Sequence, residues 1–460
     1  METASQVLKA GVPSFAAARN ACKLCAPLGA CWAFKGVEGA VPLIHGSQGC
    51  ATYIRRYLIS HFREPVDIAS SSFGESSAIF GGGANLSAAL DNVVRQYHPE
   101  LIGVASTCLS ETIGDDVPRI VRHWAENSSS SAKDLSVVTV STPSYSGTHA
   151  EGFHAAVRAL TAALAREGPR GEHVNLLPGM LSPDDLRHLK EIVAMFGLEA
   201  VLLPDYSETL DAPTQAEFDR IPHGGTPLKA IRSMGQATAT LEFGRTLAQS
   251  ENTAGRWLEK ELRVPRCALG IPLGIRETDA FFRELEKISG RPTPLEFARE
   301  RGRLIDAYVD GHRYLFGQRA IVYGEEDLVV GIVAFLSEIG VVPVLCASGG
   351  ESGQLSQQIH AVLADGASPV TVREGADFAE IEEEAAQLAP DLIIGNSKGQ
   401  SLACKLKVPL VWLGFPIHDR FGAQRILHVG YRGTQQLFDR VVNALLQHKQ
   451  AASSVGYSYL

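Results

Sequence analysis

Short runs of β-branched and aliphatic residues alternate along this chain with segments that carry apolar residues at helical spacing. Such alternation is typical of parallel sheets whose strands are joined by crossover helices. The runs predicted as strands are 101–106, 137–140, 173–177, 200–203, 266–271, 319–323, 341–345, 369–372, 391–395 and 409–412. Segments predicted as helices include 84–97, 152–166 and 294–316, and a polar, serine-rich loop is predicted at 127–131. The sequence therefore predicts an α/β protein of three Rossmann-like domains with parallel sheets flanked by helices, at residues 1–165, 166–316 and 317–460.

The length and net charge of the chain limit the classes of protein to which it can belong. With 460 residues, of which 45% are hydrophobic, it can bury the cores of about three domains without disulfides. A net charge of −9 without a basic run argues against nucleic acid as a partner. No apolar run reaches the roughly 18 residues of a membrane span, and the segment before Cys25 lacks the apolar stretch of a secretory signal. We therefore expect a cytoplasmic protein whose eight cysteines stay reduced.

Three cysteines, Cys25, Cys50 and Cys108, occur in turns rich in Gly, Ser or Pro. Free backbone N–H groups in such turns can hydrogen-bond to sulfides, which suits iron–sulfur ligation. Cys108 directly follows the predicted strand 101–106, at the sheet edge where open α/β sheets place their ligands. Ser144 follows the next predicted strand, so it is expected at the same edge. These residues are the candidate cluster ligands.

Core packing and zinc are the alternatives for the cysteines. Free Cys is among the most buried residue types, and we expect core packing for the four in apolar or helical surroundings, which are Cys31, Cys267, Cys346 and Cys404. Cys22 and Cys25 have the CxxC spacing of many zinc sites, but a closed zinc site needs a second pair or histidines close by. Because Cys50 and Cys108 are single and far apart in sequence, zinc is disfavoured.

The motifs around these cysteines resemble those of component 1 of nitrogenase, in particular its β-type subunits and their relatives. The matching motifs, in order over roughly the first 150 residues, are CAPLGA at 25–30, HGSQGC at 45–50, HFREP at 61–65, IFGG at 79–82, TCLSETIGDD at 107–116 and TPSYSG at 142–147. Each motif is weak alone, whereas six in one order are specific. The remainder of the chain resembles the family in pattern only.

The resemblance implies roles for individual residues. Cys25, Cys50 and Cys108 correspond to thiolate ligands of the P-cluster, a double-cubane electron relay shared with the α subunit. Ser144 corresponds to a ligand of the oxidised cluster, with an ordinary turn serine as the alternative. Phe80 corresponds to an aromatic residue where an ATP-dependent iron–sulfur reductase homodimer docks. Tyr53 corresponds to a position on the path to the partner's cofactor, and packing is the alternative for both aromatic residues.

The ligand count leaves the cluster site one thiolate short. Cubane clusters are generally held by four thiolates, and the loops offer three. Either Ser144 or Cys22 completes the site, or the other ligands come from a second chain. The resemblance favours the second arrangement: an α2β2 heterotetramer with an α-type paralogue, in which a P-cluster or a single 4Fe-4S cluster lies between the chains. The partner would bind the nitrogenase-type iron cofactor, and no catalytic residue is expected on this chain.

Three functions remain open at this point. The first is the β-type subunit of a nitrogenase or of a nitrogenase-like reductase such as methylthio-alkane reductase. The second is the N-type subunit of the scaffold on which the iron–molybdenum cofactor matures, although such subunits commonly retain fewer cluster cysteines. The third is a non-enzymatic solute-binding or metal-binding module, which would be secreted or lipid-anchored.

Two departures from the family pattern bear on the first function. Only about twenty residues precede Cys22, where molybdenum nitrogenase β subunits usually carry a long extension. CKLC also stands where a single cysteine is usual. Both favour a nitrogenase-like reductase outside the molybdenum group. Nucleotide binding by this chain is not expected, because Gly324-Glu-Glu-Asp327 lacks the GxGxxG glycines and no Walker A sequence occurs.

Overall fold

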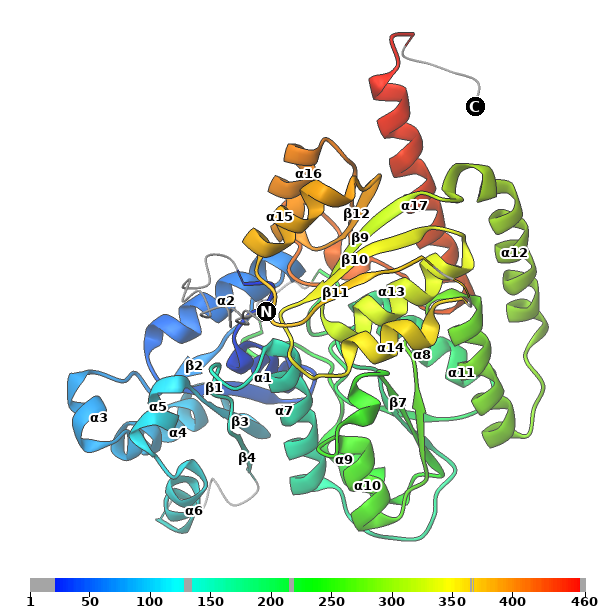
Figure 1. The fold of residues 1–460 in the computed structure, drawn as a ribbon. Helices are drawn as coiled ribbons and strands as arrows, with labels where there is room; N and C mark the ends of the chain where they lie inside the picture. The colour runs from blue at the N-terminus through cyan, green and yellow to red at the C-terminus, as the bar shows by residue number, and fades with distance from the viewer. Residues whose placement is uncertain (1–20, 128–134, 215–218, 365, 367, 456–460) are drawn as a thin grey trace, which may run out of the picture.

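A computed structural model describes residues 21–127, 135–214, 219–364, 366 and 368–455. The chain forms three parallel sheets, each flanked by helices (Figure 1). This confirms the predicted fold class. The predicted loop at 127–131 lies almost entirely outside the described residues.

The first sheet has the strand order β2-β1-β3-β4. Its strands are β1 (Ala40–His45), β2 (Ala69–Ser70), β3 (Leu101–Ser106) and β4 (Ser136–Val140). The helices of this part are α1 (Ala26–Lys35), α2 (Gln48–Phe62), α3 (Glu75–Phe80), α4 (Gly83–Tyr97), α5 (Cys108–Ile113), α6 (Val117–Asn127) and α7 (His149–Leu164). Successive strands are added first on one side of β1 and then on the other. The order therefore reverses between β1 and β3, which are paired in parallel along their whole length.

The second sheet has the order β6-β5-β7-β8 and reverses between β5 and β7. Its strands are β5 (Val174–Leu177), β6 (Ala200–Leu202), β7 (Ala239–Phe243) and β8 (Arg266–Leu269). Its helices are α8 (Pro183–Met195), α9 (Leu228–Ser233), α10 (Ala254–Leu262), α11 (Gly274–Ser289) and α12 (Leu295–Leu315), with short 3₁₀ turns η2 (Met234–Gln236) and η3 (Leu247–Gln249).

The third sheet has the order β11-β10-β9-β12-β13 and reverses between β9 and β12. Its strands are β9 (Arg319–Gly324), β10 (Val342–Ser348), β11 (Thr371–Arg373), β12 (Leu392–Gly395) and β13 (Leu410–Trp412). Its helices are α13 (Glu326–Glu338), α14 (Leu355–Val362), α15 (Phe378–Leu388), α16 (Gln400–Leu406) and α17 (Gly430–Ala452), with 3₁₀ turns η4 (Ser397–Gly399) and η5 (Ala423–Arg425).

The helix α1 joins the three sheets through one aromatic core. Trp32 of α1 contacts Phe62 of α2, Phe153 of α7, Tyr206 after β6 and Phe415 after β13, with ring centroids 5.0–5.9 Å apart. Three of these contacts are edge-on and the fourth is tilted, in keeping with the preference of aromatic rings for edge-to-face packing. Every residue of α1 is buried. The position of this helix is therefore fixed by all three parts of the chain.

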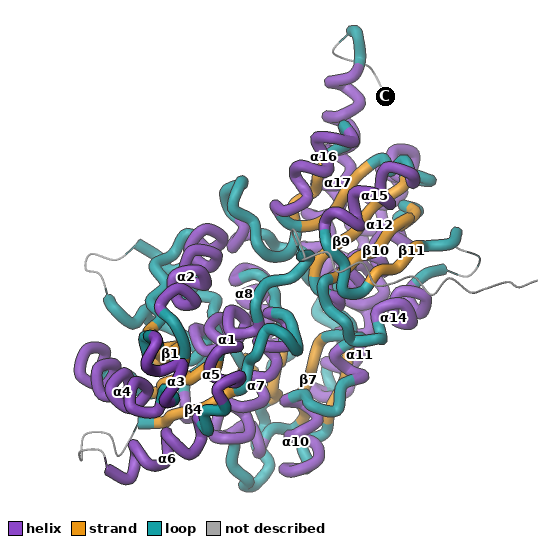
Figure 2. Tube along the Cα trace, turned by 60° about the vertical axis from the view of Figure 1, so that its left-hand side comes forward, coloured by secondary structure: helices purple, strands orange, loops and turns teal. Residues whose placement is uncertain are grey.

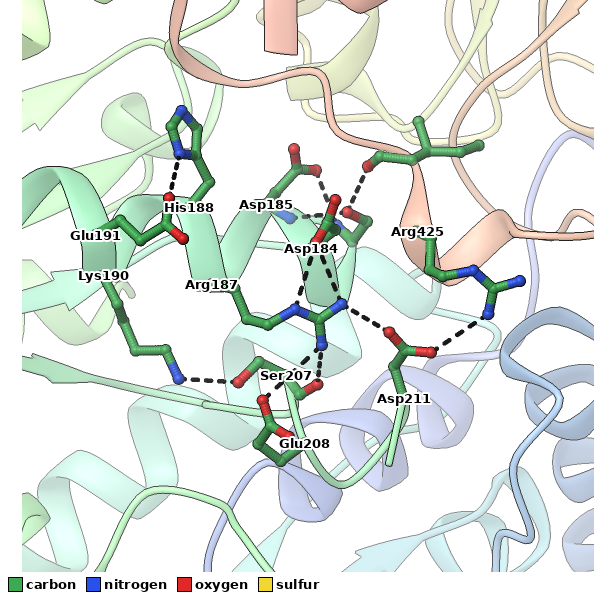
Figure 3. A network of polar contacts seen from close by, with 12 residues as sticks. Asp184, Asp185, Arg187, His188, Lys190, Glu191, Ser207, Glu208, Asp211 and Arg425 are labelled. Carbon is green, nitrogen blue, oxygen red and sulfur yellow. Dashed lines mark hydrogen bonds and ion pairs between the residues drawn. The ribbon is translucent and has the colours of Figure 1, made fainter. Parts of the chain in front are cut away.

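A polar network fastens the segment after β13 to α8 (Figure 3). The buried Asp185 carboxylate accepts the N–H groups of His428 and Val429, at 2.8 and 3.2 Å. Below it, the Asp211 carboxylate lies between two guanidinium groups, 2.6 Å from Arg187 and 3.6 Å from Arg425. Because burial of Asp185 is offset by several hydrogen bonds, its carboxylate can stay charged inside the protein. The last part of the chain is thereby tied to the second sheet.

All ten predicted strands are present, with ends shifted by at most three residues. The predicted helices at 84–97, 152–166 and 294–316 correspond to α4, α7 and α12. The domain boundaries at 165/166 and 316/317 stay a prediction. No helix in the described part of the chain has both the length and the apolar character needed to cross a membrane.

Candidate functional site

Two of the three candidate thiols lie where the first sheet reverses its strand order. Cys50 is in the first turn of α2, which follows β1, and Cys108 opens α5 directly after β3. Ligands of open α/β sheets bind outside the carboxyl ends of such neighbouring strands. The two strand ends are joined by the Thr107 hydroxyl, which donates to the His45 carbonyl at 3.0 Å. Gly46 permits this approach, since a Cβ atom there would lie 2.4 Å from the same hydroxyl.

Cys25 reaches this place from α1, where it is the N-cap residue. His149, at the start of α7, holds the preceding residue: its backbone N–H donates to the Leu24 carbonyl at 3.0 Å, and its Nδ1 accepts the Leu24 N–H at 3.4 Å. Because Nδ1 is an acceptor, Nε2 carries the proton that is donated to Glu325 at 3.0 Å. His149 therefore orients the chain just before the thiol.

Ser144 connects Cys25 to Cys108. Its backbone N–H donates to the Cys108 sulfur at 3.2 Å, and its hydroxyl accepts the N–H of Ala26 at 3.3 Å. The turn that carries Ser144 is fixed to β3 by Thr142, whose N–H donates to the Ser106 hydroxyl at 2.9 Å. A hydrogen bond from backbone to sulfur is the contact that stabilises a thiolate ligand.

The three candidate cysteines differ in their exposure to solvent. Cys50 is exposed, whereas Cys25 and Cys108 are half-buried. Burial raises the pKa of Cys25 to about 11; the Leu28 N–H opposes this, and the nearby Cys50 and Cys108 thiols raise it further. In the described part of the chain, no three His, Cys, Asp or Glu side chains converge tightly enough to hold one metal ion.

Exposed apolar side chains accompany the candidate ligands. Leu109 follows Cys108 and is 39% exposed, Tyr145 follows Ser144 and is 68% exposed, and Tyr53, one turn after Cys50, is 44% exposed. Phe80, at the end of α3, is 86% exposed. Large apolar side chains grouped on a surface mark a site of association with another molecule.

Cys22 does not share the site of Cys25. It is buried in a separate hydrophobic cluster with Tyr323 and Val344 of the third sheet, and burial raises the pKa of its thiol to about 12. Lys398 fixes this segment by donating to the carbonyls of Ala21 and Lys23, at 2.7 and 3.2 Å.

The four cysteines predicted to pack in the core differ in burial. Cys31 and Cys346 are fully buried, as core packing predicts, and Cys267 is half-buried. The core assignment is wrong for Cys404, which is exposed on α16. An apolar helical pattern on one short helix could not show which of its faces meets the sheet.

Sequence reasoning missed the roles of several histidines. His45 links the end of β1 to Ser71 and Asp115, each at 3.1 Å, and burial lowers its pKa. His61 accepts the N–H of Ile417 at 2.9 Å inside the aromatic core. The motifs HGSQGC and HFREP pointed to both positions, but these partners are distant in sequence. No local signal marked His149.

The comparisons with known proteins agree over almost the whole chain. The family described as nitrogenase component 1 type oxidoreductase matches residues 25–446. The nitrogenase molybdenum-iron protein beta chain of Clostridium pasteurianum is 34% identical over 429 residues, covering 93% of each chain. The corresponding chain of Methanothermobacter marburgensis is 36% identical over 92% of this chain and 93% of its own length, and the vanadium-iron protein beta chain of Trichormus variabilis is 34% identical over 92% of each. A solved structure of nitrogenase Cp1 at pH 6.5 superposes with a TM-score of 0.92 at 32% identity, over 97% of both chains.

Proposed function

Because the chain belongs to the nitrogenase component 1 type oxidoreductases, as a β-type subunit, we propose that it relays electrons through an iron–sulfur cluster at its interface with an α-type paralogue. The electrons come from an ATP-dependent iron–sulfur reductase and pass to a metal cofactor in the partner. The enzyme is a nitrogenase-like reductase of the methylthio-alkane reductase or nitrogenase type. The chain acts in the cytoplasm, where its thiols stay reduced.

The observation that carries this proposal is the backbone contact that links the strand-reversal point to α1: Ser144 donates its N–H to the Cys108 sulfur and accepts the N–H of Ala26, which follows Cys25. Cys25, Cys50 and Cys108 come from three helix starts, where free backbone N–H groups can donate to sulfur. Three thiolates fall short of a cubane's usual four, and exposed Leu109 and Tyr145 offer the contact surface for a chain that supplies the rest. The residues present therefore fit a P-cluster or a shared 4Fe-4S cluster.

An iron–sulfur cluster supplies one-electron transfer, and this chain's residues set its surroundings. Cys25, Cys50 and Cys108 would hold the cluster as thiolates. The Ser144 N–H offsets negative charge on the Cys108 sulfur. The Ser144 hydroxyl, which accepts the N–H of Ala26, would be a further ligand for an oxidised cluster. Tyr53 lies toward the partner and Phe80 in the surface for the reductase.

The N-type scaffold is the second candidate function. A scaffold has no need for a relay that changes redox state, and its subunits commonly retain fewer cluster cysteines. The presence of all three cysteines favours the relay. We accordingly propose an α2β2 complex that carries out reduction over one that only assembles a cofactor.

The test is made on the complex co-expressed with its α-type partner. We expect ATP-dependent substrate reduction once the cognate reductase is added, and an EPR signal that appears on oxidation and changes in the Ser144→Ala variant. This substitution leaves the N–H contact to Cys108 in place, so it isolates the hydroxyl. Ser146→Ala, in the same turn, is the matched control.

A different set of results supports the scaffold instead. The Ser144→Ala complex would then have the same EPR signal as the wild type, and no substrate would be reduced at any concentration of the reductase. The complex would instead donate a cofactor precursor to an apo-nitrogenase.

A further inference from the structure

Asp115 lies where three segments around the candidate thiols meet. Its backbone N–H donates to the Ser110 carbonyl at 3.1 Å, which attaches it to the end of α5. Its carboxylate accepts the N–H of Gly82, at 3.2 and 3.0 Å, and lies 3.1 Å from Nε2 of His45. In Figure 2, as in Figure 1, α3, α4 and α5 lie close together beside β1. We call the contacts of Asp115 with Ser110, Gly82 and His45 the Asp115 junction.

On one side, the junction fixes the turn that follows Phe80. Gly81 has a φ of 88°, and a Cβ atom on it would lie 3.1 Å from the Asp115 carboxylate. A Cβ atom on Gly82 would lie 2.2 Å from the Phe73 ring and 2.9 Å from Asp115. A positive φ and such close approach both favour glycine. The turn therefore packs directly on the carboxylate, while Phe80 beside it is exposed.

On the other side, the junction reaches the turn that carries Cys50. Gly46 follows β1 and leads into α2, whose first turn holds Cys50. The Ser71 hydroxyl accepts the N–H of Gly46 at 3.0 Å and lies 3.1 Å from Nδ1 of His45. Since this hydroxyl accepts from Gly46, it can donate its own proton to Nδ1. Nε2 then carries the ring proton, which is donated to Asp115.

The side chains that connect the two turns are buried. His45 and Ser71 are 0% and 3% exposed, and the Asp115 side chain is 9% exposed. The Phe73 ring packs edge-on against His45, with ring centroids 4.8 Å apart, and the Phe73 N–H donates to the Gly46 carbonyl at 3.0 Å. Displacement of either turn would leave buried polar groups unpaired, which is costly. The separation of the two turns is therefore fixed by the junction.

An electron relay depends on this separation. Electron transfer slows steeply as the distance between donor and acceptor grows, and a displacement of about 1 Å at a reacting centre can cost about 100-fold in rate. In the proposed function, the reductase docks at Phe80, and Cys50 and Cys108 hold the cluster that receives the electron. We propose that His45 and Asp115 are positioning residues, which hold the docking turn at a fixed distance from the cluster ligands. They have this role only if the proposed function holds.

Two substitutions of His45 break different contacts. Asn places an acceptor near the position of Nδ1 but is too short to reach Asp115, whereas Gln reaches Asp115 and keeps a donor there. In the iron-loaded complex, His45→Asn should exchange backbone hydrogen for deuterium about tenfold faster at both 46–50 and 80–83. His45→Gln should retain wild-type exchange at 80–83, as should His123→Asn, the control at an exposed position of α6. Unchanged exchange at 80–83 in His45→Asn overturns the inference.

Electron delivery to the same complexes is measured by stopped-flow mixing with the cognate reductase and ATP. We expect electron transfer from the reductase to be at least about tenfold slower in His45→Asn and to recover in His45→Gln. Iron content, and reduction of the oxidised cluster by dithionite, which does not dock, should stay unchanged. Equal reductase-driven rates in the wild type and His45→Asn contradict the inference. A wild-type complex that takes electrons from dithionite but not from the reductase contradicts the proposed function instead, and the exchange measurement then still decides whether the two turns are connected.

Discussion

Cys22 and Cys25 belong to one short motif, yet their side chains enter different cores. Leu24, between them, is held by His149, and the chain passes there from the third sheet to α1. The position of Cys22 therefore distinguishes between its two possible roles, which are a spare cluster ligand and a packed core residue. Its buried position among apolar side chains of the third sheet favours packing.

Replacement of Cys22 by Ala should accordingly affect stability and not iron. We expect a loss of about 1 kcal/mol in the free energy of unfolding, as for removal of a small buried group, with iron content unchanged. Cys25→Ala should show the reverse, a loss of iron with a smaller change in stability. Iron analysis together with denaturant unfolding of both variants checks this, and loss of iron from Cys22→Ala would make Cys22 a ligand.

His61 makes stability depend on pH. Burial, with Arg63 and His418 nearby, lowers the pKa of His61 from 6.5 to about 3. Between pH 6.5 and pH 3, His61 is protonated in the unfolded chain but neutral in the folded chain. The free energy of unfolding therefore falls as the pH drops below 6.5, by about 1.4 kcal/mol per pH unit.

At pH 5 the expected loss from His61 is therefore about 2 kcal/mol. His61→Gln removes the titration and keeps an acceptor for the Ile417 N–H, so its unfolding midpoint should change less between pH 7 and pH 5 than that of the wild type. His448→Gln, at an exposed position, should behave as wild type. Identical pH dependence in His61→Gln would refute this assignment.

At the scale of elements, α1 and α7 cross in close contact at two glycines. A Cβ atom on Gly29 would lie 1.7 Å from the His149 carbonyl oxygen, and one on Gly152 would lie 1.9 Å from that of Ala26. Because Cys25 is the N-cap of α1 and Ser144 contacts Ala26, this crossing sets where the first thiol meets the other two.

Gly152→Ala should thus disturb the site from a distance. We expect a destabilisation of about 1–3 kcal/mol from overpacking and a lower iron content, because the start of α1 is displaced. Gly302→Ala in α12, where a Cβ meets nothing within 4 Å, should be neutral or slightly stabilising. Full iron occupancy in Gly152→Ala would show that the crossing does not position Cys25.

The elements that could be predicted are those whose pattern is local. The strand at 101–106 is predicted to the residue, since it is an unbroken buried apolar run with β3 at the centre of its sheet. Two central strands gave no such signal: β1 contains Pro42, which is unusual in a paired strand, and β7 contains Glu242, buried through its pair with Arg266 at 2.6 Å. The Asp115 junction also could not be predicted, because its partners come from segments distant in sequence.

At the scale of the whole molecule, the proposed cluster site depends on contacts from all three sheets. All three sheets hold α1, and the segment after β13 is tied back to α8, so the site rests on the entire chain. A rigid half-site of this kind suits a cluster completed by a second chain. The chain expressed alone should therefore retain little iron, while the complex with the α-type partner retains it. A lone chain with a full cluster complement would contradict the shared interface.

The most direct measurement is the iron content and visible cluster absorption of the co-purified complex with single cysteine substitutions. Cys50→Ala and Cys108→Ala should each abolish both signals, because each removes a thiolate from the strand-reversal point of the first sheet. Cys346→Ala, in the buried core of β10, should leave both signals intact. Equal iron in all three variants would contradict the assignment of these thiols as cluster ligands.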